Sequence, residues 1–550
     1  MRLIAAGLLL AAATVHAQTP PTAEQDAARR VRADVEFLAS DSLEGRDTGS
    51  KGYVIAAEYV ASQFRAIGLE PGGEKGGWFQ QVPFRRASNL APPRIGINFG
   101  AREVALEIGK DAALRPSLTE KERKLSAGLV FVGYGLKDGR FGIDDYRGLD
   151  LNGKIAVMMS GTPTGLPTDI AAHLSESKVR FAAAAGAVGL IEVRRNDGQR
   201  INGSVQRGGR PLVDWVDSTG KAGSVPAGMR LQLSVSDEWA ARLFEGAPKS
   251  LDAVRKQAKA NSRVGPRGFA LKPVISVDGQ SKWEDFTSPE VVGLLKGSDP
   301  SLAAQHVILM GHLDHLGVRA EPKLGEDAIF NGALDNASGV ATMLEAAREF
   351  AAQPSRPKRS VLFIANTGEE RGLLGADFYA NHPTIPAHDI VGVVDLDMPM
   401  LLYPFTDVIA FGADHSTIGA MVAEAGTSMS VSVSPDPMPE EAIFTRSDHY
   451  MFVRQGVPAV LLMTGHANGG KAQWDNYMAK IYHTPKDDLG QAIDWNAGAR
   501  YAMLNYRIAR AMADAPQRPM WLAGDYFGDL FDPKGPRAST RTTAAAAGKP

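Results

Sequence analysis

The chain contains no cysteine among its 550 residues. This absence excludes disulfide bonds, zinc sites built from thiolates, and cysteine nucleophiles. A strong excess of one charge is also missing, because 60 basic residues face 62 acidic ones and the formal net charge is −2. Since no broad basic surface follows from this balance, neither nucleic acid nor an anionic membrane face is expected as a partner.

Long apolar runs are almost absent, and the only long one lies at the start of the chain. Arg2 precedes an apolar run from Leu3 to Thr14, which ends in the small residues of a Val15-His16-Ala17 cleavage site. The run is shorter than the ~20 residues that a membrane span needs. Residues 1–17 therefore read as a secretory signal, and we expect an exported protein, periplasmic or secreted, without a membrane anchor after cleavage.

The rest of the chain divides into regions of different pattern. With 44% apolar residues over this length, two or three hydrophobic cores are expected. Residues 18–119 open with two helical patterns that end at Gly68, residues 120–265 combine short strands with helices as a compact unit of their own, and residues 266–530 alternate strands and helices. The polar tail, 531–550, is expected to be disordered.

The alternation after Pro273 indicates the fold class. Near-continuous apolar segments such as HVILMG, SVLFIAN and VPAVLLMTG alternate with helical patterns. This is typical of an α/β protein with a mixed, mostly parallel central sheet that is flanked by helices on both faces. Ligands of such sheets bind outside the carboxyl ends of the strands.

Five side chains with metal-binding chemistry follow apolar, strand-like segments. They are His312 in GHLDHLG, Asp335 in NGALDNASG, Glu370 in NTGEERGLLGA, Asp397 in VVDLDM and His483 in YHTPKDD. Imidazole nitrogen and carboxylate oxygen suit zinc-like ions, and a catalytic site leaves a coordination position open for water. Two imidazoles and three carboxylates can hold two such ions if one carboxylate is shared. Each segment alone is a weak signal, but their order and their polar loop context favour a two-metal hydrolytic site.

These segments, together with RSDHYMFVRQGVPAVLL, resemble in sequence and order the co-catalytic dizinc exopeptidase family. That family includes secreted bacterial aminopeptidases and glutamate carboxypeptidase. The similarity extends to the segment FLASDSLEGRDTGSKGYVIAAEYVASQFRAIGLEP, which looks like the family's amino-terminal part. It also extends to VGYG, DDYRGLDLNGKIAVMMSGTP and AAAAGAVGLI, which are similar to the protease-associated domain inserted in some members. The resemblance thus covers most of the mature chain.

The resemblance implies a role for each matching residue. Asp335 would bridge two zinc ions, His312 and Asp397 would complete one site, and Glu370 and His483 the other. Glu369 would be the general base. Adjacent side chains in an irregular loop point in different directions, so Glu370 can reach a metal while Glu369 faces the water.

Further roles follow from the same resemblance. Tyr482 would donate a hydrogen bond to the developing oxyanion, although a packed aromatic ring is an equally good interpretation. Asp314 would orient His312, and the Asp335-Asn336 peptide bond would be cis. Supporting roles are expected for the other polar residues of these segments: His315, Ser447, Asp448 and His449.

Two positions depart from the family pattern. Leu334 stands where relatives commonly have an acid, and Asp395 where they often have asparagine. Neither position is a metal ligand, so the two departures concern only the side chains that surround the ligands.

The resemblance implies an exported zinc aminopeptidase that removes amino-terminal residues from peptides. Acidic groups of the enzyme would recognise the free amine of the substrate. A dizinc carboxypeptidase or dipeptidase is the alternative within the enzymes. A non-catalytic receptor, as transferrin receptor is on this fold, is the alternative from another class, but such proteins have lost ligands that are present here. The insertion supplies none of the expected ligands, so we expect it to restrict access and favour short peptides. Oligomeric state stays open.

Overall fold

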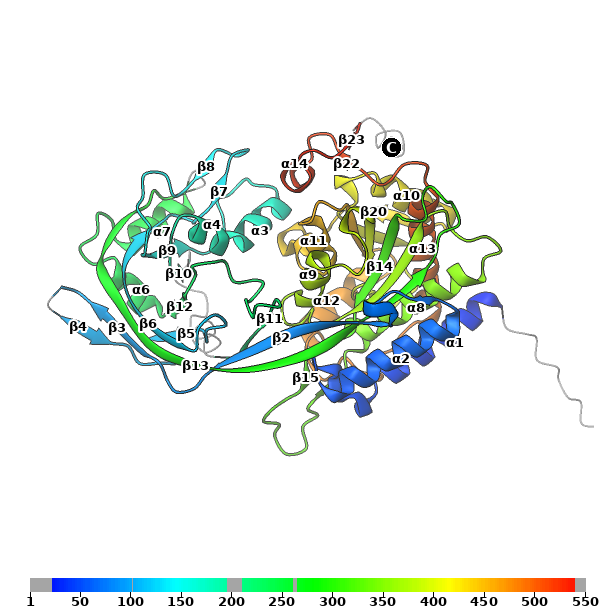
Figure 1. Cartoon of the computed structure of the whole chain (residues 1–550), viewed down its shortest axis with the longest axis horizontal. Helices are drawn as coiled ribbons and strands as arrows, with labels where there is room; N and C mark the ends of the chain where they lie inside the picture. The colour runs from blue at the N-terminus through cyan, green and yellow to red at the C-terminus, as the bar shows by residue number, and fades with distance from the viewer. Residues whose placement is uncertain (1–21, 101, 195–209, 261–264, 540–550) are drawn as a thin grey trace, which may run out of the picture.

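The computed structural model describes residues 22–100, 102–194, 210–260 and 265–539, which form two lobes (Figure 1). The lobes are connected by a ribbon of two antiparallel strands, β2 (Phe79–Asn89) and β13 (Phe269–Leu295). The 27-residue β13 takes part in both sheets: residues 274–280 pair with β6 of one lobe, and residues 291–295 pair with β17 of the other. The two sheets are therefore joined through a shared strand.

The sheet of the larger lobe has a parallel centre. Its strand order is β11-β2-β13-β17-β14-β18-β21-β19-β20, and β17, β14, β18 and β21 are parallel to one another. The bounds are β11 (Leu212–Trp215), β17 (Ser360–Asn366), β14 (His306–His312), β18 (Ile390–Asp395), β21 (Ala459–Thr464), β19 (Asp407–Phe411) and β20 (Ser432–Ser434). Every residue of β14, β17, β18 and β21 is buried, as the near-continuous apolar segments predict. The expected α/β class with a mixed central sheet is confirmed.

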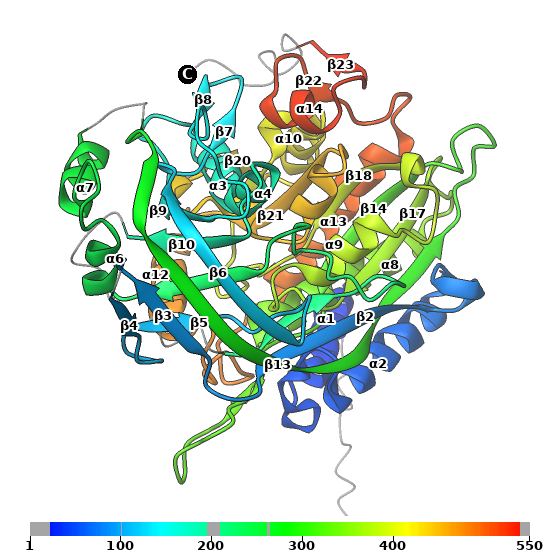
Figure 2. The ribbon, with the colours of Figure 1, turned by 60° about the vertical axis from the view of Figure 1, so that its left-hand side comes forward.

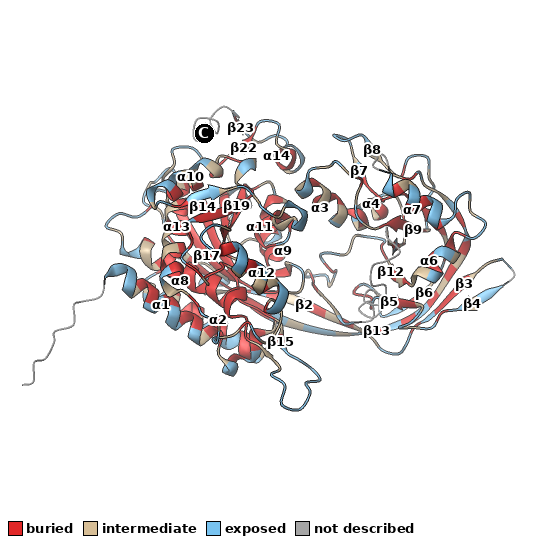
Figure 3. Cartoon of the chain, turned by 180° about the vertical axis from the view of Figure 1, so that it is seen from behind, coloured by how far each residue is buried: buried red, intermediate tan, exposed pale blue. Residues whose placement is uncertain are grey.

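Helices flank this sheet in two groups. The first group packs together and against β13, β14 and β18: α1 (Ala23–Leu38), α2 (Lys51–Ile67), α8 (Ser338–Ala352), α10 (Ile418–Ser428) and α13 (Trp495–Asp514). The second group, α9 (Leu374–Asn381) and α11 (His449–Val453), packs near β18 and β21, and Figure 3 shows the buried strands between the helices. The predicted end of the second helix is confirmed, since Gly68 ends α2 with a φ of 89°, and the Ser50 side chain caps its start.

The smaller lobe is a second sheet with its own helices (Figure 2). Its strand order is β4-β3-β13-β6-β9-β10-β12-β5, with β6, β9, β10 and β12 parallel. The strands other than β13 are β3 (Arg94–Asn98), β4 (Glu103–Ala105), β5 (Ala112–Leu114), β6 (Glu122–Phe131), β9 (Ile155–Met159), β10 (Gly189–Val193) and β12 (Leu231–Val235). Its helices are α3 (Thr168–Glu176), α4 (Lys178–Ala184), α6 (Asp237–Leu243) and α7 (Leu251–Lys259).

The expected boundaries of this lobe, 120 and 265, are therefore too narrow. Strands β3 to β5 lie before residue 120, and the first half of β13 lies after residue 265, yet all belong to the second sheet. The early strands are short, and β3 and β5 pair with segments more than a hundred residues away, so their local pattern does not identify the sheet they join. We call residues 90–280 the inserted lobe, although β11 within this range joins the catalytic sheet, and the remainder the catalytic lobe.

The inserted lobe contacts the catalytic lobe a second time, away from the ribbon. Helix α3 packs against the short 3-10 helices η6 (Pro439–Glu441) and η7 (Ile443–Thr445). His173 Nδ1 lies 2.6 Å from the Tyr450 hydroxyl, and the Tyr526 hydroxyl donates to Asp138 at 2.7 Å. The two lobes are therefore in contact at two places, along the ribbon of β2 and β13 and again at α3.

The tail differs from the expectation of disorder over its first part. Strand β23 (Arg537–Ala538) pairs with β22 (Trp521–Leu522), and Arg537 donates to the Gly528 carbonyl at 2.8 Å. These hydrogen bonds order a segment that has too few apolar residues to predict a fold by itself. Residues 540–550 and the expected signal, 1–17, lie outside the described part of the chain. Within the described part, no helix combines the length and apolar character that crossing a membrane requires.

We expect Gly52→Ala to destabilise the protein by about 1–3 kcal/mol, the usual cost of overpacking. A Cβ at Gly52 would lie 1.8 Å from the Leu43 carbonyl oxygen, so α2 or the preceding turn must move. Gly128→Ala is the matched control, because a Cβ there meets nothing within 4 Å. Urea denaturation of both variants checks the difference, and equal midpoints for the two would contradict the close approach.

Candidate active site

The five predicted ligands come together at one edge of the catalytic sheet. His312 is the last residue of β14, Glu370 follows the end of β17, and Asp397 follows the end of β18. Asp335 lies in the turn η3 (Ala333–Ala337) before α8, and His483 follows α12 (Gly470–Lys480). His312, Glu370 and Asp397 thus lie at the carboxyl ends of parallel strands, as expected, whereas Asp335 and His483 do not follow strands of the sheet and reach the same place from a turn and from the end of a helix.

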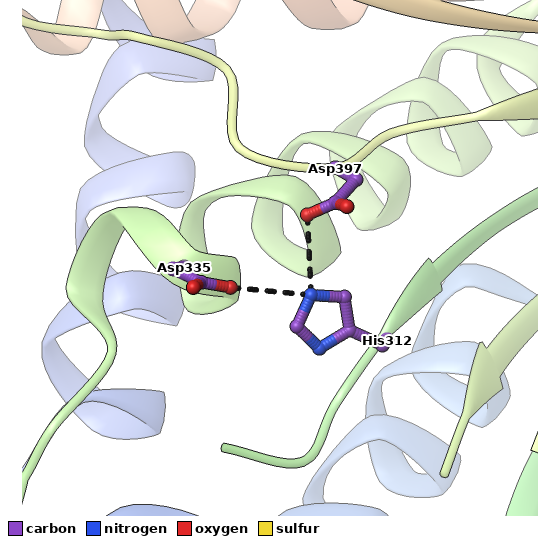
Figure 4. A group of neighbouring side chains, drawn as sticks. All are labelled: His312, Asp335 and Asp397. Carbon is purple, nitrogen blue, oxygen red and sulfur yellow. Dashed lines mark hydrogen bonds and ion pairs between the residues drawn. The ribbon is translucent and has the colours of Figure 1, made fainter. Parts of the chain in front are cut away.

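The carboxylate of Asp335 lies at the centre of the group, with its two oxygens facing different imidazoles. Asp335 Oδ1 is 3.3 Å from His312 Nε2, and Asp335 Oδ2 is 3.2 Å from His483 Nε2. Figure 4 shows the first half, in which His312 also lies 3.1 Å from Asp397 Oδ1. The second half is completed by Glu370, whose Oε2 is 3.4 Å from His483 Nε2.

These distances fit bound metal ions. Atoms that bind one tetrahedral ion at about 2.0–2.2 Å lie about 3.4 Å from one another. The contacts of Asp335 with the two histidines, at 3.3 and 3.2 Å, match that separation on both sides. The donor set of imidazoles and carboxylates without sulfur is one that zinc accepts.

His315 has a larger part in the site than the sequence suggested. Its Nδ1 lies 2.6 Å from Glu370 Oε1 and 3.9 Å from Asp335 Oδ2, although it was expected only to support the site. The ring is fully buried, and its other nitrogen, Nε2, has no hydrogen-bond partner among the described residues. A third imidazole therefore faces the same two carboxylates as His483.

The charges around the site separate the two adjacent glutamates. Burial and Asp335 raise the pKa of Glu370, but hydrogen bonds from His315 and His483 lower it to about 2. Burial raises the pKa of Glu369 well above its ordinary value, with Glu370 and Asp397 adding to the effect against the attraction of His312. Glu370 is thus held as a carboxylate, whereas Glu369 is the more basic group, as proton transfer requires.

Asp314 orients His312 through its backbone and not through its side chain. The Asp314 carbonyl oxygen lies 3.0 Å from His312 Nδ1, which directs Nε2 toward Asp335 and Asp397. The Asp314 carboxylate instead accepts hydrogen bonds from the Thr48 hydroxyl at 2.9 Å and from the Glu369 backbone N–H at 3.2 Å. Asp314 thus contacts His312 through its carbonyl group, while its carboxylate links the loops of His312 and Glu369.

The turn that carries Asp335 is held by two polar side chains. Asn336 accepts from the backbone N–H groups of Gly339 at 3.0 Å and Met398 at 3.2 Å, and donates to the Leu396 carbonyl at 2.9 Å. It thus joins the Asp335 turn to the loop of Asp397. The Asp335-Asn336 peptide bond is cis, as the resemblance implies.

On the other side of the turn lies Asp487, for which the sequence suggested no role. Its carboxylate accepts from the backbone N–H groups of Leu334 and Asp335, both at 3.0 Å, and from the Tyr477 hydroxyl at 3.0 Å. Asp487 stands four residues after His483 in the segment YHTPKDD, and this proximity is the sequence feature that could have identified it.

A buried arginine lies beneath the site. Arg46 donates to the carbonyl groups of Leu313, Asn331, Gly332 and Leu38, which belong to the loops that carry the ligands and to the end of α1. Burial lowers its pKa to about 10, although the surrounding carboxylates oppose this. The guanidinium therefore remains charged at neutral pH and offsets part of the negative charge above it.

The two departures from the family pattern have different surroundings. Leu334 is buried, and its backbone N–H bonds to Asp487. Asp395 accepts from the His449 backbone N–H at 3.1 Å, and the Ser447 hydroxyl lies 2.8 Å from both Asp395 and Asp397. Ser447 therefore supports Asp397, as expected, while Asp448 is held by Asn366 at 2.5 Å.

Two cavities meet at Glu369 and Tyr482. The first, of about 700 Å³, is bordered by His312, Asp335 and Asp397. The second, of about 670 Å³, is bordered by Glu370 and His483. Glu369 and Tyr482 line both cavities, and the Tyr482 ring stacks on His483 with centroids 3.8 Å apart. The expected base and the expected oxyanion donor thus stand where the two spaces join.

Comparisons with known proteins agree with this geometry. A probable zinc metalloprotease of Pyricularia oryzae is 26% identical over 261 residues, which are 41% of this chain and 50% of that protein. A probable leucine aminopeptidase 2 of Aspergillus oryzae is 29% identical over 200 residues, 35% of this chain and 37% of that protein. The chain thus spans half or less of the length of these relatives.

Among solved structures, the aminopeptidase from Aneurinibacillus sp. strain AM-1 shares the fold. The likeness covers 89% of this chain and 95% of that one, with a TM-score of 0.50 and 21% identity. It supports the mixed α/β sheet flanked by helices that the coordinates show.

Residues 290–509 match the model described as Peptidase family M28. The match begins within β13 and ends within α13, so it contains the parallel centre of the sheet and all the residues that meet at its edge. This part of the chain is therefore similar to peptidase family M28.

Proposed function

We propose that the protein is a zinc-dependent aminopeptidase that hydrolyses the first peptide bond of peptides. Two zinc ions would be held with Asp335 between them, one by His312 and Asp397 and the other by Glu370 and His483. When bound, such ions polarise a water molecule and the substrate carbonyl. The observation that carries the proposal is the junction of two cavities at Glu369 and Tyr482, because a peptide bond placed there has space on both sides.

Glu369 would move the proton. It is half-buried, basic for a carboxyl group, and borders both cavities. It would accept a proton from the attacking water and later give it to the leaving amine. Tyr482 would donate its hydroxyl hydrogen to the developing oxyanion, a role that its raised pKa permits because the phenol stays protonated.

The first cavity would hold the amino-terminal residue. Its wall is mainly apolar and includes Met398, Met438, Ile443, Leu461, Met463, Trp474 and Met478. Glu440, Glu441 and Asp475 line the same space. Glu441 and Asp475 already pair with Arg446 and Lys471, so Glu440 would be the carboxylate that accepts a substrate ammonium group. A large apolar first residue with a free amine fits this combination.

The alternatives fit less well. All five ligands and Glu369 are present and close together, whereas a receptor on this fold has no need of them. A carboxypeptidase would require a cation that is free to bind the terminal carboxylate, but the two cations of the first cavity are already paired, Arg446 with Glu441 at 3.1 Å and Lys471 with Asp475 at 2.7 Å. The expected signal at residues 1–17 would place the mature enzyme outside the cytoplasm.

We expect Glu369→Gln to lower kcat by roughly 10²–10⁴-fold while metal content stays at about two ions per chain. The substitution removes the proton acceptor but no proposed ligand. Asp335→Ala should instead lose both metal and activity, because one carboxylate faces both histidines. Metal analysis beside hydrolysis of leucine anilide measures both effects. Loss of metal in Glu369→Gln with retention in Glu370→Gln would reverse the two assignments.

Asn336→Ala should weaken metal binding by about 10–100-fold, as the loss of a group that positions a ligand usually does. Its side chain joins the loops of Asp335 and Asp397. Asn89→Ala removes a comparable side-chain hydrogen bond, to the Leu114 carbonyl in the inserted lobe, and serves as the control. Titration against a chelating dye gives the affinities, and equal values for the two variants would show that Asn336 does not shape the site.

A panel of amino-acid anilides tests the substrate class. Leucine, methionine and phenylalanine derivatives should be cleaved faster than glycine and aspartate derivatives, because the first cavity is largely apolar. Acetylation of the amine should abolish cleavage, and dialysis against a chelator should do the same. Cleavage of acetylated derivatives at the same rate as free ones would reject an aminopeptidase.

A further inference from the structure

The second cavity lies between the lobes and is built from both of them. The catalytic lobe contributes Glu370, His483 and part of α9 and α11, and the inserted lobe contributes residues of α3, α4 and β11. Its volume of about 670 Å³ is in the range that encloses a small ligand, about 300–1,000 Å³. Because it opens from the Glu370 side of the site, it is the space available to the leaving part of a peptide.

Three arginines line this cavity, and their partners differ. Arg446 pairs with Glu441 at 3.1 Å, and Arg454 lies 3.7 Å from Asp377. Asp377 is shared, since it also accepts from the Trp215 indole N–H at 2.8 Å. Arg180, at the centre of α4, makes neither a hydrogen bond nor an ion pair within the part of the chain that the structure describes.

The charges near Arg180 favour an anion from outside. Burial and the positive charge of Arg454 lower the pKa of the Arg180 guanidinium, so two like charges face each other across the lobes. Asp377 and Glu176 are the nearby acids, but neither forms an ion pair with Arg180: Asp377 lies beside Arg454, and burial raises the pKa of Glu176 to about 7. The Arg180 guanidinium is exposed to the cavity, so an anion that enters the cavity can pair with it.

We propose that Arg180 and Arg454 bind the carboxyl-terminal carboxylate of a short peptide whose first residue occupies the other cavity. The proposal rests on the proposed aminopeptidase function. It names the substrate class as free di- and tripeptides, since an extended chain advances about 3.3–3.6 Å per residue and only a few residues fit the space. A guanidinium suits this task because its planar donors match the geometry of a carboxylate.

The arrangement also gives the inserted lobe a direct part in substrate choice. Arg454 belongs to the catalytic lobe beside α11, whereas Arg180 is presented by the opposite wall. A carboxylate between them would contact both lobes at once. A longer peptide, or one that ends in an amide, would place neutral groups beside the two cations and leave their repulsion in place.

The test compares a tripeptide acid, Leu-Ala-Ala, with its carboxyl-terminal amide, and uses leucine anilide to establish basal turnover. The wild-type protein should prefer the acid in kcat/KM. Arg180→Gln should lower the ratio of acid to amide by about 10-fold, the usual value of one hydrogen bond to a charged group. Glu176→Gln should raise that ratio, because it removes an anion that competes for the arginines.

Arg147→Gln is the matched control. Arg147 is an exposed arginine of the inserted lobe that does not line the cavity, and among the described residues it pairs with Asp144 at 3.8 Å. It should leave the ratio unchanged. Thermal unfolding confirms that each variant is folded before the kinetics are compared.

Failure of the inference and failure of the proposed function give different results. If the anilide is cleaved but acid and amide are used equally, or if Arg180→Gln keeps the wild-type ratio, carboxylate recognition is wrong and the aminopeptidase stands. If none of the three substrates is cleaved, the proposed function is wrong. Calorimetric binding of the acid and the amide to Glu369→Gln repeats the comparison without turnover, and equal affinities there also overturn the inference.

Discussion

The placement of one carboxylate, that of Asp335, governs the whole site. Its two oxygens face His312 and His483 at 3.3 and 3.2 Å, so a small rotation of the side chain would lose one partner or the other. A side chain alone is too free to maintain this geometry. The backbone on either side is therefore held from two directions, by Asp487 at the amide groups and by Asn336 against the loop of Asp397. His312, Glu370 and Asp397 need only the ends of adjacent parallel strands, and His483 is supplied by the loop after α12.

The same site is a concentration of buried negative charge, which is unfavourable without partners. Burial raises the pKa of Asp314, Asp397 and Asp448, and the neighbouring carboxylates add to this effect. Three imidazoles, the Arg46 guanidinium and several backbone N–H groups offset part of the cost. Bound divalent cations would offset more of this cost, so folding and metal binding would stabilise the same arrangement of side chains.

The sequence predicted what local pattern and order determine. The buried strands β14, β17, β18 and β21, the end of α2 at Gly68 and the meeting of His312, Glu370 and Asp397 all follow from apolar runs and from the rule for strand ends. It did not predict the start of the inserted lobe, because β3 and β5 pair with strands far along the chain. Nor did it identify Asp487, Arg46 or the contact of His315 with Glu370, since these depend on loops whose course no periodicity describes.

The shared strand β13 changes how the inserted lobe should be regarded. A domain attached by a flexible linker could move without affecting the site, but here one strand carries hydrogen bonds of both sheets, and β2 pairs with it over eleven residues between them. Movement of the lobe must bend this ribbon. The contacts of α3 with η7, and of His173 with Tyr450 at 2.6 Å, restrain the opposite side. With both sides restrained, the distance between α4 and α11 is a property of the fold, and side chains such as Arg180 can act as a fixed wall of the active site.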